Sequence, residues 1–103
     1  MHNPVYRYVF AANVPLEEVE TCLLLAIFAT ESLHGESEVR LEAGHYFEAE
    51  QRTCVVDGGT QVSRDLNRVF IGFLRREFGE DSFRVERAAE VPRRQPEEVQ
   101  IGS

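Results

Sequence analysis

The sequence predicts an α+β domain of the ferredoxin-like kind, a βαββαβ sandwich in which two helices cover one face of a four-stranded antiparallel sheet. Three observations support this fold. Short segments are rich in β-branched and aromatic residues, two long segments repeat apolar residues every three or four positions, and glycines or prolines separate these segments. We expect the first and third strands to lie in the middle of the sheet.

The first half of the fold is a strand followed by a helix. Residues 5–11, VYRYVFA, are β-branched and aromatic, which predicts a strand. Pro15 suits the first turn of a helix, and several glutamates follow it where the helix dipole favours acids. Apolar positions recur with helical spacing over residues 16–30, and Gly35 is a predicted C-cap.

The middle of the chain predicts a β-hairpin. Residues 38–47, EVRLEAGHYF, alternate between apolar and polar side chains, as a half-buried strand does. A polar turn over 48–52 leads to a shorter apolar strand over 53–57. A turn centred near Glu50 would place His45 opposite Val55.

The second half closes with another helix and strand. Apolar residues have helical spacing from Val62 to Phe78, and Gly79 ends the predicted helix. Residues 81–88 alternate again and predict the last strand. We therefore expect one α+β domain over residues 1–88. Residues 89–103 contain two prolines and mixed charge, which predicts a flexible C-terminal tail.

The charge of the chain restricts its partners. Eighteen acidic and 11 basic residues give a formal net charge of −7, which argues against nucleic acid and anionic membranes. The predicted topology matches that of RNA-recognition domains, but the strand 53–57 lacks the aromatic residues on which RNA bases stack. All 11 bases are arginine, so neither a Schiff-base lysine nor a phosphate-loop lysine exists here.

Expectations about the compartment and the cofactors rest on sequence features that are absent. Its longest apolar run, residues 22–29, is far shorter than the ~20 residues that cross a bilayer. Neither a signal-peptide pattern nor a disulfide framework is visible, so we expect a cytoplasmic protein. Cys22 and Cys54 lack the spacing of a metal site, and in the predicted register His45 and Cys54 point to opposite sheet faces. No metal and no cofactor are expected.

The apolar residues exceed what a single core of this fold needs. The strand 5–11 is apolar on both faces, and the helix over 16–30 is apolar on most of its circumference. Exposed apolar patches are uncommon on monomers, so we expect self-association, most simply as a two-fold homodimer. The packing of these surplus residues against the second helix is the alternative. The predicted interface residues are Tyr6, Tyr8, Phe10, Tyr46, Leu24 and Phe28.

His45 is the best candidate for acid–base chemistry. It belongs to the apolar face of its predicted strand, and the predicted register places Asp57 on the same face of the partner strand. Such a pair at the end of a sheet would act on a small ligand. A histidine at the edge of the core, satisfied by a carbonyl or by Asp57, is the structural alternative. No serine or cysteine nucleophile is recognisable.

Residues 55–60, VVDGGT, join the hairpin to the second helix. This stretch resembles the strand–Asp-x-Gly-Thr phosphate loops of actin-like ATPases and sugar kinases over four residues, which implies phosphate binding at Gly58, Gly59 and Thr60. Those enzymes need two large domains, which 103 residues do not supply. In the structural interpretation the glycines take positive φ in a short connection and Thr60 caps the helix.

Two functional hypotheses follow. The leading one is a small non-enzymatic interaction or regulatory module that forms a homodimer or binds another protein. The second is a small ligand-binding protein or enzyme with a pocket near His45, Asp57 and the Gly58-Gly59 turn.

Overall fold

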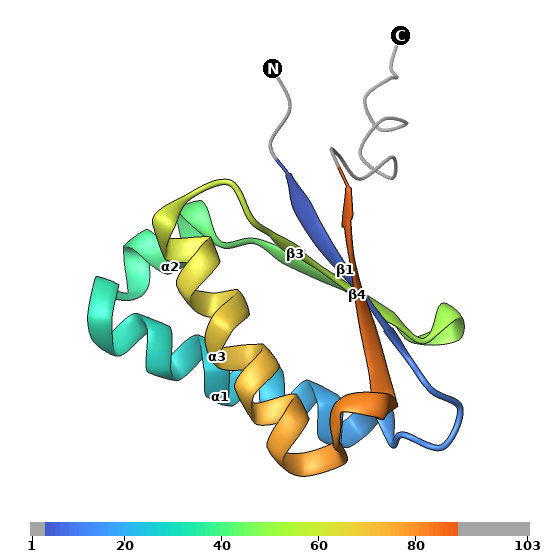
Figure 1. The fold of residues 1–103 in the computed structure, drawn as a ribbon. Helices are drawn as coiled ribbons and strands as arrows, with labels where there is room; N and C mark the ends of the chain where they lie inside the picture. Colours follow the sequence, from blue (N-terminus) through green and yellow to red (C-terminus); the bar gives the residue numbers. More distant parts are fainter. Residues whose placement is uncertain (1–3, 89–103) are drawn as a thin grey trace, which may run out of the picture.

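Four antiparallel strands form one sheet, and three α-helices lie on one side of it (Figure 1). The computed structural model describes residues 4–88, so the predicted tail over 89–103 lies outside the described residues. The elements in chain order are β1 (Val5–Phe10), α1 (Leu16–His34), α2 (Glu36–Glu42), β2 (His45–Glu48), the 3₁₀ turn η1 (Ala49–Gln51), β3 (Thr53–Asp57), α3 (Gln61–Phe78), the 3₁₀ turn η2 (Glu80–Ser82) and β4 (Phe83–Ala88).

The sheet has the strand order β2-β3-β1-β4, so β1 and β3 occupy the two central positions, as the sequence predicted. β1 pairs with β3 on one side and with β4 on the other, and β2 pairs only with β3. β2 and β4 are therefore the two edge strands. The α+β class is confirmed, with three α-helices in place of the two that were predicted.

The core lies between the sheet and the helices. Tyr8 and Phe10 of β1 and Cys54 and Val56 of β3 point into it, and the ring of Tyr8 lies 4.8 Å from that of Phe70 on α3. The helices contribute mainly aliphatic and small side chains. The buried ones are Val19, Cys22, Leu23 and Ala26 from α1, Val39 from α2, and Val62, Leu66, Phe70 and Leu74 from α3.

The predicted strand over 38–47 is wrong in its first half. Residues 36–42 form α2, and β2 begins only at His45. Val39 and Ala43 are buried, but Leu41, which the alternating pattern assigned to the same apolar face, is 82% exposed. A separation of four residues fits one face of a helix as well as one face of a strand, and here the helical period is the correct one.

The hairpin register differs by one residue from the predicted one. His45 pairs with Val56 and Tyr46 with Val55, because Glu48 and Thr53 close a loop of residues 49–52. The predicted turn over 48–52 has five residues and is centred on Glu50. The observed loop has four, so the centre of the hairpin lies half a residue further along the chain. Since side chains alternate along a strand, this shift exchanges the faces of β2 relative to β3.

Arg52 holds the end of this loop in place. It adopts a left-handed backbone conformation with φ of 55°, and its guanidinium donates hydrogen bonds to the carbonyls of Ala11, at 2.7 Å, and Val14. These bonds tie the hairpin loop to the segment between β1 and α1.

The corner before α3 is a helix-capping structure. Thr60 is the N-cap, as predicted: its Oγ1 accepts a hydrogen bond from the backbone N–H of Ser63, and Ser63 Oγ accepts one from the N–H of Thr60, each at 3.0 Å. The predicted positive φ at Gly58 and Gly59 is wrong, because among the described glycines only Gly35 and Gly79 have it.

Candidate functional site

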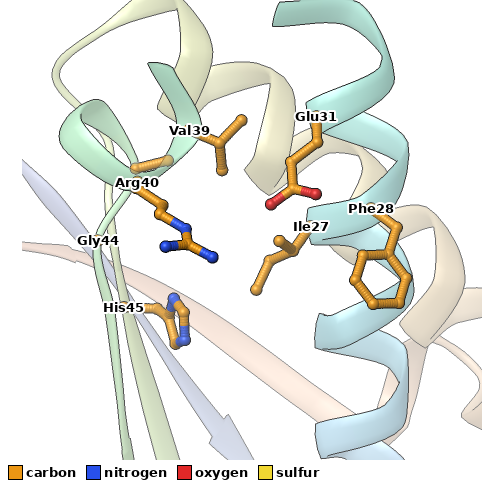
Figure 2. A pocket seen from close by; sticks show the side chains of 8 residues that line it. Ile27, Phe28, Glu31, Val39, Arg40, Gly44 and His45 are labelled. Atoms are coloured by element: carbon orange, nitrogen blue, oxygen red, sulfur yellow. The ribbon is translucent and has the colours of Figure 1, made fainter. Parts of the chain in front are cut away.

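An open groove of about 430 Å³ lies between α1, α2 and the start of β2 (Figure 2). Three polar side chains, Glu31, Arg40 and His45, reach into it from three different elements. Ile27, Phe28 and Val39 supply its apolar surface, and Ala43 and Gly44 complete the lining. We take this groove as the candidate functional site because it contains the sequence-predicted residue His45.

The break between α1 and α2 creates the groove. Gly35 has φ of 93°, which ends α1, and its N–H donates to the carbonyl of Glu31 at 2.8 Å. The chain then turns into the short helix α2, whose buried residue Val39 packs against the core. This turn separates α2 from the side of α1 that carries Ile27, Phe28 and Glu31, and the space between them stays open.

Asp57 positions the floor of the groove from the neighbouring strand. Its Oδ2 accepts a hydrogen bond from the N–H of Gly44 at 3.0 Å, and its own N–H donates to the carbonyl of Gly44 at 2.9 Å. A Cβ atom at position 44 would lie 3.0 Å from the same carboxylate oxygen. Asp57 therefore acts on the groove indirectly, because it fixes the backbone that leads into His45.

The charges of the groove lie on opposite sides. The guanidinium of Arg40 and the imidazole of His45 are on the side of α2 and β2, and the carboxylate of Glu31 faces them from α1 (Figure 2). Arg40 also donates a hydrogen bond to Glu36 one turn earlier on α2, at 2.6 Å. Both partners of this ion pair are largely exposed, so it contributes little to stability.

The α1 side of the groove continues into an exposed apolar surface. Leu24, Leu25 and Phe28 are 53%, 48% and 58% exposed. Phe28 follows Leu25 by three residues and Leu24 by four, so the three side chains are neighbours on the helix surface. We call these three residues the α1 patch. It is contiguous with the groove because Phe28 belongs to both.

The predicted pair of His45 and Asp57 is not formed. The register places His45 on the helix-covered face with Val56, whereas Asp57 pairs with Val5 and points to the other face. The register also places Cys54 on the same face as His45, contrary to the prediction. Among residues 4–88, however, no group of three or more His, Cys, Asp or Glu side chains is arranged to hold a metal ion.

The phosphate-loop candidates have structural roles. Gly58 is buried, and a Cβ there would lie 2.5 Å from Cε2 of Tyr6, so the absence of a side chain permits a close approach of the Tyr6 ring. Thr60 caps α3, and its hydroxyl donates to the carbonyl of Glu42 at 2.9 Å. Gly59 is exposed. None of these residues lines the groove.

The predicted interface residues separate into two groups. Tyr8 and Phe10 are buried beneath the helices and form no surface of this chain, so the version of the interface that uses them does not hold. Tyr6 shares their sheet face, and Tyr46, at 41% exposed, lies on the opposite one.

Leu24 and Phe28 remain accessible on α1. They are the two predicted interface residues that share one surface.

The two cysteines are poor nucleophiles in the folded chain. Burial raises the pKa of Cys54 to about 12, with a smaller contribution from the charge of Glu20. Burial, followed by the charges of Glu77 and Glu18, also raises the pKa of Cys22. A thiol whose pKa is raised carries little thiolate at neutral pH, and neither cysteine lines the groove. The groove thus offers charged and apolar contacts to a partner, but no thiol.

Sequence reasoning missed Glu31 and Arg40. Most residues of α2 were assigned to a strand, and Glu31, near the end of the first helix, was given no role. One signal was available: Glu36 and Arg40 have the i,i+4 spacing of a helical ion pair, and they are joined in that way in the structure.

Comparisons with known proteins give no relative. No protein-family model, curated protein or solved structure matches this chain. Within residues 4–88, no helix has the length and apolar character needed to cross a membrane.

Proposed function

We propose that this chain is a non-enzymatic interaction module that self-associates through the α1 patch and the adjoining groove. The observation that carries the proposal is the exposure of Leu24, Leu25 and Phe28 side by side on α1. The exposure of such a cluster to water is unfavourable in free energy, and its burial against a partner is favourable. Contiguous apolar surface on a small protein is typical of interaction sites. The same helix is buried on its other side through Val19, Leu23 and other core residues.

A second copy of this chain is the partner that the charges favour. A two-fold interface brings the same surface of both copies together, so a surface with opposite charges on its two sides can complement itself. Here Glu31 lies on the α1 side of the groove, and Arg40 and His45 lie on the other. In a two-fold dimer Glu31 of each copy faces Arg40 of its partner, while the α1 patches meet at the centre.

The face of the sheet that points away from the helices is less suited to this role. Arg7 and Arg84 each lie 3.0 Å from Glu86 on that face, so these charged side chains already have partners. An apolar partner would have to cover them, and the burial of charges costs free energy. This polarity supports an interface on α1.

We also propose that the fold is a ferredoxin-like sandwich to which α2 has been added. The central positions of β1 and β3 and the place of α1 and α3 on one side of the sheet support this assignment. In this view α2 is an insertion between the first helix and the second strand. The groove is then a feature of this chain rather than of the general fold.

A second candidate function is the binding of a small ligand in the groove. The observation that favours it is the convergence of one carboxylate, one guanidinium and one imidazole around a space of about 430 Å³, a volume within the range of ligand sites. Self-association and ligand binding are distinguishable, because a ligand in this groove would compete with a dimer.

Sedimentation equilibrium tests the self-association. We expect the wild-type chain to have twice its monomer mass at high micromolar concentration. The Leu24→Gln/Phe28→Gln variant should weaken the dimer about tenfold or more, since exposed anchors at the centre of an interface carry most of its affinity. Leu33→Gln removes a leucine that is also exposed but lies on another side of α1, so it is the matched control. A monomeric wild-type chain would refute the proposal.

A charge exchange tests the two-fold arrangement. Glu31→Arg alone and Arg40→Glu alone should each weaken the dimer, because each places like charges opposite one another. The combined variant restores opposite charges across the interface and should recover most of the affinity. If the combined variant is weaker than both single variants, Glu31 and Arg40 do not face each other between copies.

A further inference from the structure

A second groove lies at the other edge of the sheet. It has a volume of about 220 Å³ and opens between α3 and the strands β1 and β4. The first groove adjoins the edge strand β2, whereas this one adjoins β4, and the strand order places these two strands at opposite edges. Its lining consists of Tyr6, Arg64, Asn67, Arg68, Ile71 and Val85.

Positive charge is concentrated in this groove. Arg64 and Arg68 are one turn apart on α3, so their side chains extend from neighbouring positions of the same helix face. Arg87 of β4 is close by, with its guanidinium carbon 6.0 Å from the centre of the Tyr6 ring. None of the three arginines forms an ion pair with another residue of the described range 4–88.

The acidic residues next to Arg64 and Arg87 in the sequence are already engaged. Asp65 accepts hydrogen bonds from His34 at 2.8 Å and from Gln61 at 2.9 Å. Glu86 accepts hydrogen bonds from Arg7 and Arg84, each at 3.0 Å. The charge of Arg68 also acts on Asp65. The chain has a net charge of −7, so three guanidinium groups that form no ion pair within residues 4–88 are unusual for its composition.

The rest of the groove is aromatic and aliphatic. Tyr6 is half-buried, and its ring lies against Gly58, which has no side chain to push it away. Ile71 and Val85 contribute apolar surface next to it. Asn67 is held by its own hydrogen bonds, because its amide donates to the carbonyls of Asp57 and Ser63. A ligand in this groove would therefore contact the ring of Tyr6 and the apolar side chains of Ile71 and Val85 in addition to the arginines.

We propose that this groove binds a small oxyanion carried on a single ring, such as an aryl phosphate or an aryl carboxylate. The guanidinium groups of Arg64 and Arg68 bind the oxyanion, since arginine forms paired hydrogen bonds with phosphate and carboxylate oxygens. The ring of the ligand packs against Tyr6, Ile71 and Val85. Ligand sites for drug-sized molecules measure about 300–1,000 Å³, so a smaller groove suits a ligand with one ring.

A titration of the full-length chain tests the proposal. The probes are phenyl phosphate, benzoate, inorganic phosphate and phenol. The binding of each is measured from the changes in the chemical shifts of the backbone amides. We expect phenyl phosphate or benzoate to bind, and the tighter of the two identifies the oxyanion. Phenol lacks the charge and inorganic phosphate lacks the ring, so each should bind about tenfold more weakly or worse.

Variants localise the site. Arg64→Gln/Arg68→Gln should weaken the binding of the best probe about tenfold or more and remove most of its dependence on salt. Arg76→Gln is the matched control, because Arg76 is an exposed arginine of α3 that does not line the groove. Absence of binding by both ring-bearing probes would overturn the proposal. Equal losses in the two variants would overturn it as well, since the binding would then be unspecific charge attraction.

Discussion

The hydroxyl of Tyr8 is a buried polar group whose only described partner is Asn67. Tyr8 is fully buried on the helix-covered face of β1 and donates a hydrogen bond to Oδ1 of Asn67 on α3. The amide of Asn67 in turn donates to the carbonyls of Asp57, at 2.9 Å, and Ser63, at 2.8 Å. This chain of hydrogen bonds connects β1, the end of β3 and the first turns of α3.

Removal of that hydroxyl should destabilise the fold. Tyr8→Phe keeps the ring against Phe70 but leaves Oδ1 of Asn67 buried without a donor, which costs about 1–3 kcal/mol. Urea unfolding measures the loss. Tyr6→Phe is the control, because the Tyr6 hydroxyl has no hydrogen-bond partner among the described residues, and it should change stability by less than about 0.5 kcal/mol. Equal effects of the two variants would contradict this role of Asn67.

Gly58 should not tolerate even an alanine. The added Cβ would lie 2.5 Å from Cε2 and 2.7 Å from Cδ2 of Tyr6, so the ring has to move, and overpacking of this kind costs about 1–3 kcal/mol. The cost comes from the Tyr6 ring, so Gly58→Ala in a Tyr6→Ala background should be nearly neutral. A double-mutant cycle by urea unfolding measures the coupling. If Gly58→Ala is equally costly with and without the Tyr6 ring, a different contact is responsible.

At the scale of elements, Gly72 is a weak point of α3. It is an exposed glycine in the middle of a helix, and a Cβ there would meet no atom within 4 Å. Glycine is about 1 kcal/mol less favourable than alanine at such a position, so Gly72→Ala should stabilise the protein by about 0.5–1 kcal/mol.

Gly35 provides the contrast for that prediction. It also has free space around it, but its φ of 93° disfavours any residue with a side chain, so Gly35→Ala should lower stability. Thermal unfolding of the two variants measures both effects. A destabilised Gly72→Ala variant would show that the glycine has a packing role in an assembled state.

The elements that the sequence predicted correctly have distinctive boundaries. Thr60 and Gly79 delimit α3, and both positions act as caps in the structure. Between Gly35, which ends α1, and β2 the sequence has no such signal, because the apolar residues Val39 and Ala43 fit a strand and a helix equally well. Leu41 would be buried in the predicted strand and is exposed in the helix that forms. The local pattern of apolar residues therefore did not distinguish α2 from a strand.

At the scale of the whole molecule, the candidate site was predictable only in part. His45 was found because a histidine on an apolar face is unusual in any fold. Glu31 and Arg40 are ordinary surface residues in the sequence, and only the angle between α1 and α2 brings them to one groove. The predicted pair of His45 and Asp57 failed for a similar reason, since the hairpin loop is one residue shorter than predicted, and a change of one residue exchanges the faces of a strand.

Two carboxylates join distant parts of the chain. Asp65 of α3 bonds His34 at the end of α1, and Glu86 of β4 bonds Arg7 of the central strand β1. Hydrogen bonds from His34 and then Gln61 lower the pKa of Asp65, and those from Arg84 and then Arg7 lower the pKa of Glu86. Both groups thus hold their protons more weakly in the folded chain than in the unfolded one.

The stability of the protein should therefore fall with acidification in a defined range. A lowered pKa contributes stability that is present above the pKa of the unfolded group, about 4, and that is lost as pH falls through the pKa of the folded group. The free energy of unfolding, measured in urea between about pH 6 and pH 2, should decline below about pH 4.5. The Asp65→Asn/Glu86→Gln variant should start lower at neutral pH and decline less steeply. Glu38→Gln removes an exposed carboxylate of α2, and its curve should stay parallel to that of the wild type. If the double variant and Glu38→Gln decline equally, the hydrogen-bonded carboxylates of Asp65 and Glu86 do not couple the stability of the fold to pH.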